Sequence, residues 1–292
     1  MSEISLLLDT SSVSSRTSSR ATPFRVYLSL GKNPGVECTP SQGGHAYYAT
    51  LGFGFSNTCY NKSGAAAWLA SEADSYIAAQ SSAGLMPYID VYYHDYEGTY
   101  YNFSTTDAAT CIADTTSLVS ALKSKLTAYG LSNPKVGIYT PNGAGGATKG
   151  PTVTTTAYWV HSAKTRKSWR DDNLACATIQ STWDAIFPEN YSYRLDQFAM
   201  KTEIFCQEKA AVGGTAKLIP VFQPTISGTS CTADQMYNVL KYSYECPEMD
   251  GLMLWTYFKD PSPAPTYYDD QDWMVGAKQF MIDYNITRGT PF

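Results

Sequence analysis

Short apolar stretches alternate with helical patterns along most of this chain, and this alternation limits the folds that it can adopt. The apolar stretches are continuous runs such as 218–222 (LIPVF), which is typical of parallel strands covered on both faces. In 292 residues the economical solution is a closed (β/α)8 barrel of the TIM type, with a doubly wound open sheet as the alternative. The predicted strands are 24–30, 47–55, 85–93, 135–139, 157–161, 191–200, 218–222 and 251–257, and the predicted helices are 65–80, 105–129, 174–187, 232–244 and 272–284.

An open sheet would normally carry a glycine-rich phosphate-binding turn after an early strand. No GxGxxG pattern follows Leu30 or Phe55, which favours the barrel. Residues 1–23 are rich in Ser, Thr and Arg and are predicted to form an extended N-terminal arm, followed by a single barrel domain at 24–292. If residues 4–8 supply a first strand, the strand at 85–93 becomes the fourth.

The composition argues against several classes of function. The net charge is −5 and charged residues make up 16% of the chain, without a dense cluster of Lys and Arg, so nucleic-acid binding is not expected. No apolar run is long enough to span a membrane. Tyrosine is abundant, at 23 residues, and its flat ring with a hydroxyl group suits contact with sugars.

The seven cysteines lack paired CxxC spacing, so a metal site is not predicted. Cys38 with Cys59, and Cys231 with Cys246, could close loops in an oxidising compartment. Four N-glycosylation sequons favour an extracellular or virion-associated protein, although no signal peptide is visible, so the localisation stays open. The sequons begin at Asn61, Asn102, Asn190 and Asn285.

Two acids, Asp95 and Glu97, follow the apolar strand at 85–93. Residues two apart in a strand lie on the same face, so these carboxyls are predicted to point together into the active-site end of the barrel. A carboxyl beside a second carboxylate holds its proton more firmly, which suits acid–base chemistry. His94 lies between them and is predicted to face the other way, as a structural residue. Asp90 precedes Asp95 by an odd offset and is also predicted on that other face.

The ends of the other predicted strands are rich in amides, carboxylates and aromatic rings. They contain no Cys/His cluster and no GxSxG nucleophile motif, so neither a metal nor another cofactor is predicted. Such a lining suits a carbohydrate ligand. The predicted ligand-binding residues are Tyr93, Tyr139, Asn142, Asp196, Gln197, Gln223, Trp255 and Tyr257.

The acidic strand resembles the motif of glycoside hydrolase family 18, the chitinases and related endo-N-acetylglucosaminidases, which read D-x-x-D-x-D-x-E on the fourth barrel strand. Asp90, Asp95 and Glu97 match three of the four acids, and Tyr93 replaces the other. Trp255, in the last strand GLMLWTY, is similar to the tryptophan that floors the family's subsite. The stretch KVGIYTPN also resembles the lysozymes of glycoside hydrolase family 25.

The family 18 resemblance implies a (β/α)8 glycosidase acting on N-acetylhexosamine glycans such as chitin or peptidoglycan. Glu97 would protonate the glycosidic oxygen, and Asp95 would orient the acetamido group that attacks the anomeric carbon. Trp255 would stack under the sugar, and Tyr139 or Tyr257 would position the acetamido group. Tyr93 at an acid position leaves open a slow enzyme, or one that binds without turnover.

Two other classes of function remain as alternatives. The first is a non-catalytic barrel that binds glycans or serves as a structural or assembly subunit, including one of a virion, and that self-associates through residues 1–23. The second is an aldolase or isomerase, which would commonly use a lysine at a strand end. Only Lys259 occupies such a position, so this alternative is disfavoured.

Overall fold

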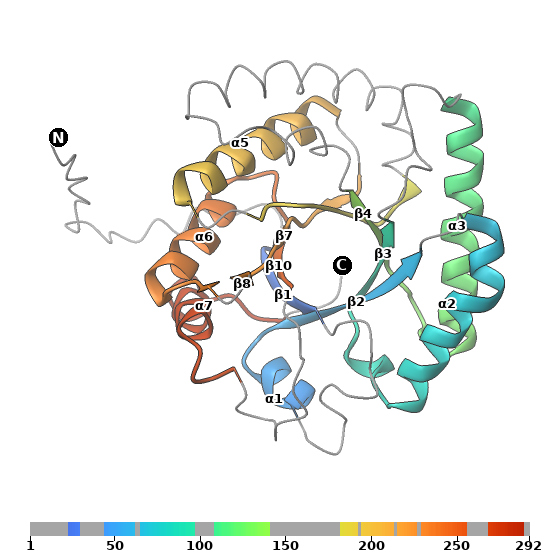
Figure 1. The fold of residues 1–292 in the computed structure, drawn as a ribbon, viewed down its shortest axis with the longest axis horizontal. Coiled ribbons are helices and arrows are strands. Elements are labelled where there is room, and N and C mark those ends of the chain that lie inside the picture. Colours follow the sequence, from blue (N-terminus) through green and yellow to red (C-terminus); the bar gives the residue numbers. More distant parts are fainter. Residues whose placement is uncertain are drawn as a thin grey trace, which may run out of the picture.

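The computed structural model describes nine stretches of the chain and places them in one ring of parallel strands surrounded by helices (Figure 1). The described residues are 23–29, 44–61, 65–96, 108–140, 182–191, 194–212, 215–226, 229–255 and 268–288.

The main sheet is wholly parallel, as the continuous apolar runs predict. Its strand order is β6-β5-β4-β3-β2-β1-β10-β7. A small antiparallel pair, β8 (Thr225–Ile226) with β9 (Thr229–Ser230), lies outside this sheet. The strands of the main sheet are β1 (Arg25–Ser29), β2 (Gly54–Asn61), β3 (Val91–Tyr96), β4 (Val136–Thr140), β5 (Ala185–Pro188), β6 (Lys217–Leu218), β7 (Val221–Phe222) and β10 (Gly251–Leu254).

The two ends of this strand order belong to one segment of chain, because only two residues separate β6 from β7. β6 pairs with β5 and β7 pairs with β10, and Glu189 forms a further parallel bridge with Val221. The sheet therefore curls back on itself. The described strands occupy seven positions around the ring. The structure therefore supports the predicted curled parallel sheet with helices outside it, and the predicted number of eight strands stays a prediction.

The direct pairing of β1 with β10 changes the predicted count of strands. It leaves no place between them for a strand supplied by residues 4–8, so β3 is the third strand of the ring and not the fourth. Residues 4–8 and the predicted strand at 157–161 lie outside the described residues.

Helices cover the outside of the ring, with α2 and α3 on one side and α5, α6 and α7 on the opposite side (Figure 1). The predictions of α2, α3, α6 and α7 are confirmed. Thr232 caps α6: its Oγ1 accepts from the Gln235 N–H, and the Gln235 side chain accepts from the Thr232 N–H. The helices are α1 (Gly44–Thr50), α2 (Ala65–Ser82), the 3-10 turn η2 (Met86–Tyr88), α3 (Ala108–Ala128), α5 (Leu195–Val212), α6 (Ala233–Glu245) and α7 (Asp272–Asp283).

Four predicted elements are wrong in type or extent. The strand predicted at 85–93 begins only at Val91, after the 3-10 turn η2. The strand predicted at 191–200 is largely helix α5, because its apolar residues recur at helical spacing and bury Phe198 and Phe205. The helix predicted at 174–187 ends in strand β5, since a four-residue apolar run fits either structure. The strand predicted at 47–55 begins only at Gly54, after helix α1.

Two sets of buried side chains follow from strand alternation. One set lies between the sheet and the helices and includes Leu28 and Tyr92. The other fills the inside of the ring and includes Tyr27, Tyr93 and Phe187. Glycine makes room for these rings: a Cβ at Gly137 would lie 2.3 Å from Cε2 of Phe187.

Three aspartates stand directly before strands, at the amino-terminal end of the ring. Each accepts the backbone N–H of a residue at or near the start of a neighbouring strand, at 2.8–2.9 Å, and each also pairs with a cationic side chain. The sets are Asp90 with the Phe55 N–H and Arg288, Asp184 with the Val136 N–H and Lys123, and Asp250 with the Leu218 N–H and Lys217.

The cysteine pairing differs from the prediction. Cys206 of α5 forms a disulfide with Cys246, which follows α6, whereas Cys231 is buried and free. The predicted Cys231–Cys246 pair is therefore wrong, because spacing along the chain does not determine connectivity. Cys38 lies outside the described residues. One sequon is also excluded as a glycosylation site in the folded protein, because Asn190 is fully buried.

Candidate functional site

The carboxyl-terminal end of the ring brings polar and aromatic side chains from several strands together. Tyr93 of β3 and Tyr139 of β4 lie inside the ring, and Trp255 directly follows β10 beside them. Asp95 stands two residues after Tyr93 and pairs in register with Tyr139. Residue 95 therefore belongs to the carboxyl end of β3.

A carboxylate that the sequence did not predict, Glu189, lies at this end of the ring. It follows β5, is half-buried, and its Oε2 accepts a hydrogen bond from the Tyr139 hydroxyl at 3.0 Å. Lys201 of α5 lies near it. Burial lowers the pKa of Lys201, and the negative charge of Glu189 opposes that shift.

Two aromatic rings stack beside this carboxylate. The rings of Tyr191 and Trp255 lie 5.7 Å apart at 23°. Burial raises the pKa of Tyr191 well above its usual value, and its neighbours Tyr139, Tyr93 and Glu189 add to the shift. Its buried hydroxyl has no partner in hydrogen-bonding geometry among the described residues.

Tyr93 lies below this group, inside the ring. It is 3% exposed, its ring packs 5.3 Å from that of Phe187, and its hydroxyl lies 3.5 Å from the Ser29 hydroxyl. Tyr93 thus helps to fill the barrel beneath the strand ends.

The remaining predicted site residues fall into two groups. Gln223 follows β7 and is half-buried. The prediction that Asp196 and Gln197 end a strand is wrong, since both lie in the first turn of α5. Asp196 is exposed and pairs with Arg194 at 2.8 Å, and this hydrogen bond lowers the pKa of Asp196. Glu97, Asn142 and Tyr257 lie outside the described residues.

His94 is a structural residue, as its place on the opposite face of β3 predicts. It is 1% exposed and stacks on Trp183, with the rings 6.2 Å apart and inclined by 12°. Burial lowers the pKa of His94 to about 3, so the imidazole is neutral in the folded protein at neutral pH.

Asp90, the first acid of the motif, lies at the other end of the strand from Asp95. Its side chain is 1% exposed and pairs with Arg288 at 3.0 Å, while its Oδ2 accepts the Phe55 N–H. Asp95 lies five positions after Asp90, or about 16 Å along the strand. Asp90 is thus a structural residue and does not reach the site at the carboxyl end.

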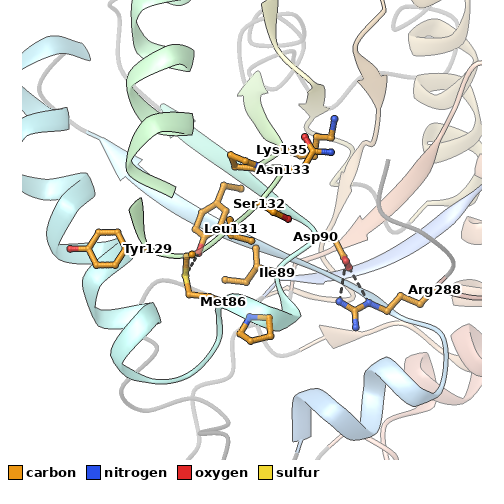
Figure 2. A pocket seen from close by; sticks show the side chains of 13 residues that line it. Met86, Ile89, Asp90, Tyr129, Leu131, Ser132, Asn133, Lys135 and Arg288 are labelled. Atoms are coloured by element: carbon orange, nitrogen blue, oxygen red, sulfur yellow. Dashed lines mark hydrogen bonds and ion pairs between the residues drawn. The ribbon is translucent and has the colours of Figure 1, made fainter. Parts of the chain in front are cut away.

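A hollow of about 580 Å³ lies at the amino-terminal end of β3 and β4, beside the ion pair of Asp90 and Arg288 (Figure 2). Its walls combine apolar side chains, such as Met86, Ile89 and Leu131, with polar ones, such as Asn133 and Lys135. In (β/α) barrels this end of the strands serves stability, whereas active sites occupy the carboxyl end. The candidate functional site is therefore the group around Tyr139, Glu189 and Trp255.

Within the part of the chain that the structure describes, no group of three His, Cys, Asp or Glu residues could hold a metal ion. No helix formed by these residues is long and apolar enough to cross a membrane.

Comparisons with known proteins find similarity of structure only. No protein-family model matches the sequence, and no curated protein matches it. Similar solved structures include three glycosidases: a proposed alpha-L-fucosidase from Bacteroides thetaiotaomicron (9% identity, TM-score 0.48, covering 92% of this chain and 97% of that one), bee venom hyaluronidase in complex with a hyaluronic acid tetramer (12%, 0.47, 90% and 96%), and a GH26 beta-mannanase from Bacteroides ovatus (9%, 0.48, 93% and 92%). At these values the comparisons assign no residue and no substrate to this chain.

Proposed function

We propose that this protein is a glycoside hydrolase that cleaves N-acetylhexosamine glycans, such as chitin or peptidoglycan, at the carboxyl end of its barrel. The observation that carries the proposal is the convergence of Tyr139, Glu189 and Trp255 beside the register position of Asp95. A flat indole next to hydrogen-bonding groups is suited to a sugar ring, which offers an apolar face and polar edges.

In this mechanism Glu97 is the general acid and Asp95 assists. Glu97 gives its proton to the glycosidic oxygen, and the bond from that oxygen to the anomeric carbon breaks. The acetamido oxygen of the same sugar forms the new bond to the anomeric carbon, while Asp95 accepts a hydrogen bond from the acetamido N–H. Water then opens the cyclic intermediate and returns a proton to Glu97.

The acidic strand of this chain departs from family 18 in two respects. The family carries its motif on the fourth strand, whereas β3 is the third strand of this ring. Asp90, moreover, belongs to the amino-terminal end. The proposal therefore takes from the resemblance only the chemistry of the Asp95–Glu97 pair.

The test compares Glu97→Gln with the parent protein and with Glu203→Gln, a matched change at an exposed position on α5. Release of reducing ends is measured on chitin oligosaccharides and on peptidoglycan strands. We expect Glu97→Gln to lose at least about a hundredfold in rate and Glu203→Gln to keep the parent rate. Parent-like activity of Glu97→Gln would show that Glu97 is not the acid. A parent that binds these glycans without cleaving them would overturn the catalytic proposal in favour of a glycan-binding barrel.

A further inference from the structure

Glu189 is held in place by the closure of the ring. It alternates with Ala185 and Phe187, both buried inside the barrel, so its side chain projects inward at the strand end. Its backbone bridges to Val221, and the N–H of the next residue, Asn190, donates to the Val221 carbonyl at 2.8 Å. The backbone that carries the Glu189 carboxylate is therefore part of the sheet.

The following turn is fixed as well. Asn190 is fully buried, and its side-chain amide donates to Thr202 Oγ1 of α5 at 3.2 Å. Because Glu189 stands between β5 and this anchored asparagine, its backbone has little freedom to move. A group held in this way can orient a ligand without a large loss of conformational entropy on binding.

The hydrogen bond between Tyr139 and Glu189 has a fixed direction. A carboxylate only accepts, so Tyr139 commits its single hydroxyl hydrogen to Oε2 of Glu189. Any further hydrogen bond to the Tyr139 oxygen must therefore come from a donor. No hydrogen bond to Oε1 of Glu189 occurs within the described residues, which leaves this oxygen able to accept a second one.

The surroundings of Glu189 supply a hydrogen-bond donor, a cation and an aromatic surface. Tyr139 already donates to it, and the positive charge of Lys201 lies near it. Beside the pair, the ring of Tyr191 stacks on that of Trp255. The site thus combines an aromatic surface with the two acceptor oxygens of Glu189.

We propose that Glu189 is a ligand-binding residue that accepts a hydrogen bond from a hydroxyl or amide N–H group of a sugar resting against Trp255, with Tyr139 as the residue that positions its carboxylate. This inference deepens the proposed function and rests on it. It adds to the Asp95–Glu97 pair a third acidic residue, which binds and does not transfer protons.

The test measures the affinity of the full chain for chitotetraose and for cellotetraose by titration calorimetry. Cellotetraose offers hydroxyl groups without acetamido groups. We expect Glu189→Gln to weaken the binding of chitotetraose by about tenfold to a hundredfold, since the charged acceptor becomes an amide. Tyr139→Phe should lose about tenfold, because it frees the carboxylate from its fixed orientation. Glu203→Gln is the matched control and should bind as the parent does.

The pattern of losses identifies the sugar group. A loss for both sugars assigns Glu189 to a hydroxyl, and a loss for chitotetraose alone assigns it to the amide N–H. Parent-like affinity of Glu189→Gln for both sugars would overturn the inference, as would a parent that binds neither. If Glu189→Gln fails to fold, as judged by its near-UV circular dichroism, the affinity of Tyr139→Phe decides.

This result is separable from the fate of the proposed function. Glu97→Gln should bind chitotetraose like the parent while losing turnover. A fully active Glu97→Gln together with a weakly binding Glu189→Gln would reject Glu97 as the acid and keep the inference. An inactive Glu97→Gln together with a Glu189→Gln that binds like the parent would keep Glu97 as the acid and reject the inference on Glu189.

Discussion

The acidic residues at the two ends of the ring of strands differ in how many hydrogen bonds and ion pairs they form. At the amino-terminal end Asp90, Asp184 and Asp250 each accept a backbone N–H and pair with a cation. At the carboxyl end Glu189 accepts one phenol hydroxyl, and the nearby Tyr191 hydroxyl finds no partner among the described residues. Satisfied polar groups stabilise a fold, whereas unused hydrogen-bonding capacity suits ligand binding.

The amino-terminal end also joins distant parts of the chain. Asp90 and Arg288 are 198 residues apart in sequence, and Arg288 donates to the Tyr88 carbonyl as well. The ion pair therefore attaches the segment after α7 to the start of β3. The comparison predicts that substitutions at the amino-terminal end cost stability and spare ligand affinity, while those at the carboxyl end do the opposite.

The largest expected effect is that of Asp90→Ala. This change leaves Arg288 without its carboxylate and the Phe55 N–H without its acceptor, in a site where the Asp90 side chain is 1% exposed. We expect the free energy of unfolding to fall by about 3–5 kcal/mol, measured by urea denaturation. The exposed Asp270→Ala is the control and should change it by less than about 0.5 kcal/mol. A loss below about 1 kcal/mol for Asp90→Ala would contradict the structural role of this end.

A second prediction concerns the interior between the two ends. Replacing glycine by alanine in an extended strand usually stabilises a protein, because it restricts the unfolded chain. At Gly137 the added Cβ would lie 2.3 Å from the Phe187 ring and 2.8 Å from the Ala185 carbonyl oxygen. We therefore expect Gly137→Ala to destabilise the protein by about 1–3 kcal/mol. Combining it with Phe187→Leu should recover part of that loss, and strict additivity of the two changes would count against direct contact.

A third prediction uses pH to probe the outward face of β3. The pKa of His94 is about 3 in the folded protein, against about 6.5 in an unfolded chain. Below pH 6.5 the His94 imidazole is protonated in the unfolded chain but stays neutral in the folded protein. The free energy of unfolding therefore decreases as the pH falls. Between pH 6.5 and 5 the loss from this residue should be about 2 kcal/mol.

The control for this prediction is His94→Phe, which keeps a flat ring beside Trp183 and removes the titrating group. Its free energy of unfolding should depend less on pH in this window, by the same amount as the parent loses there. Equal pH dependence of parent and variant would mean that His94 takes up a proton in the folded state.

Local sequence signals predicted much of the fold. Thr232 and Gln235 are three residues apart, and the cap they form needs no other part of the chain. The apolar run of β3 is similarly self-contained. By contrast, the apolar run of β5 (AIFP) is too short to distinguish a strand from a helix. The order of strands, and with it the third position of β3, depends on pairing between distant segments.

The candidate site was predictable only in part for the same reason. Tyr139 and Trp255 are aromatic residues at predicted strand ends, so composition and position were enough to find them. Glu189 stood after a stretch predicted as helix, and its partner Tyr139 is 50 residues away in sequence. Only the pairing of β4 with β5 shows that the two side chains meet.

The smallest expected effect belongs to Asp196, which the sequence placed at the end of a strand and the structure places in a helix. Asp196 is exposed in the first turn of α5 and pairs with Arg194, which is also exposed. Such pairs contribute little because solvent screens them, so Asp196→Asn should change the free energy of unfolding by less than about 0.5 kcal/mol. Its affinity for chitotetraose should equal that of the parent, because its exposed carboxylate already pairs with Arg194. A loss of affinity like that of Glu189→Gln would instead extend the site onto α5 and weaken the distinction between the strand ends and their surroundings.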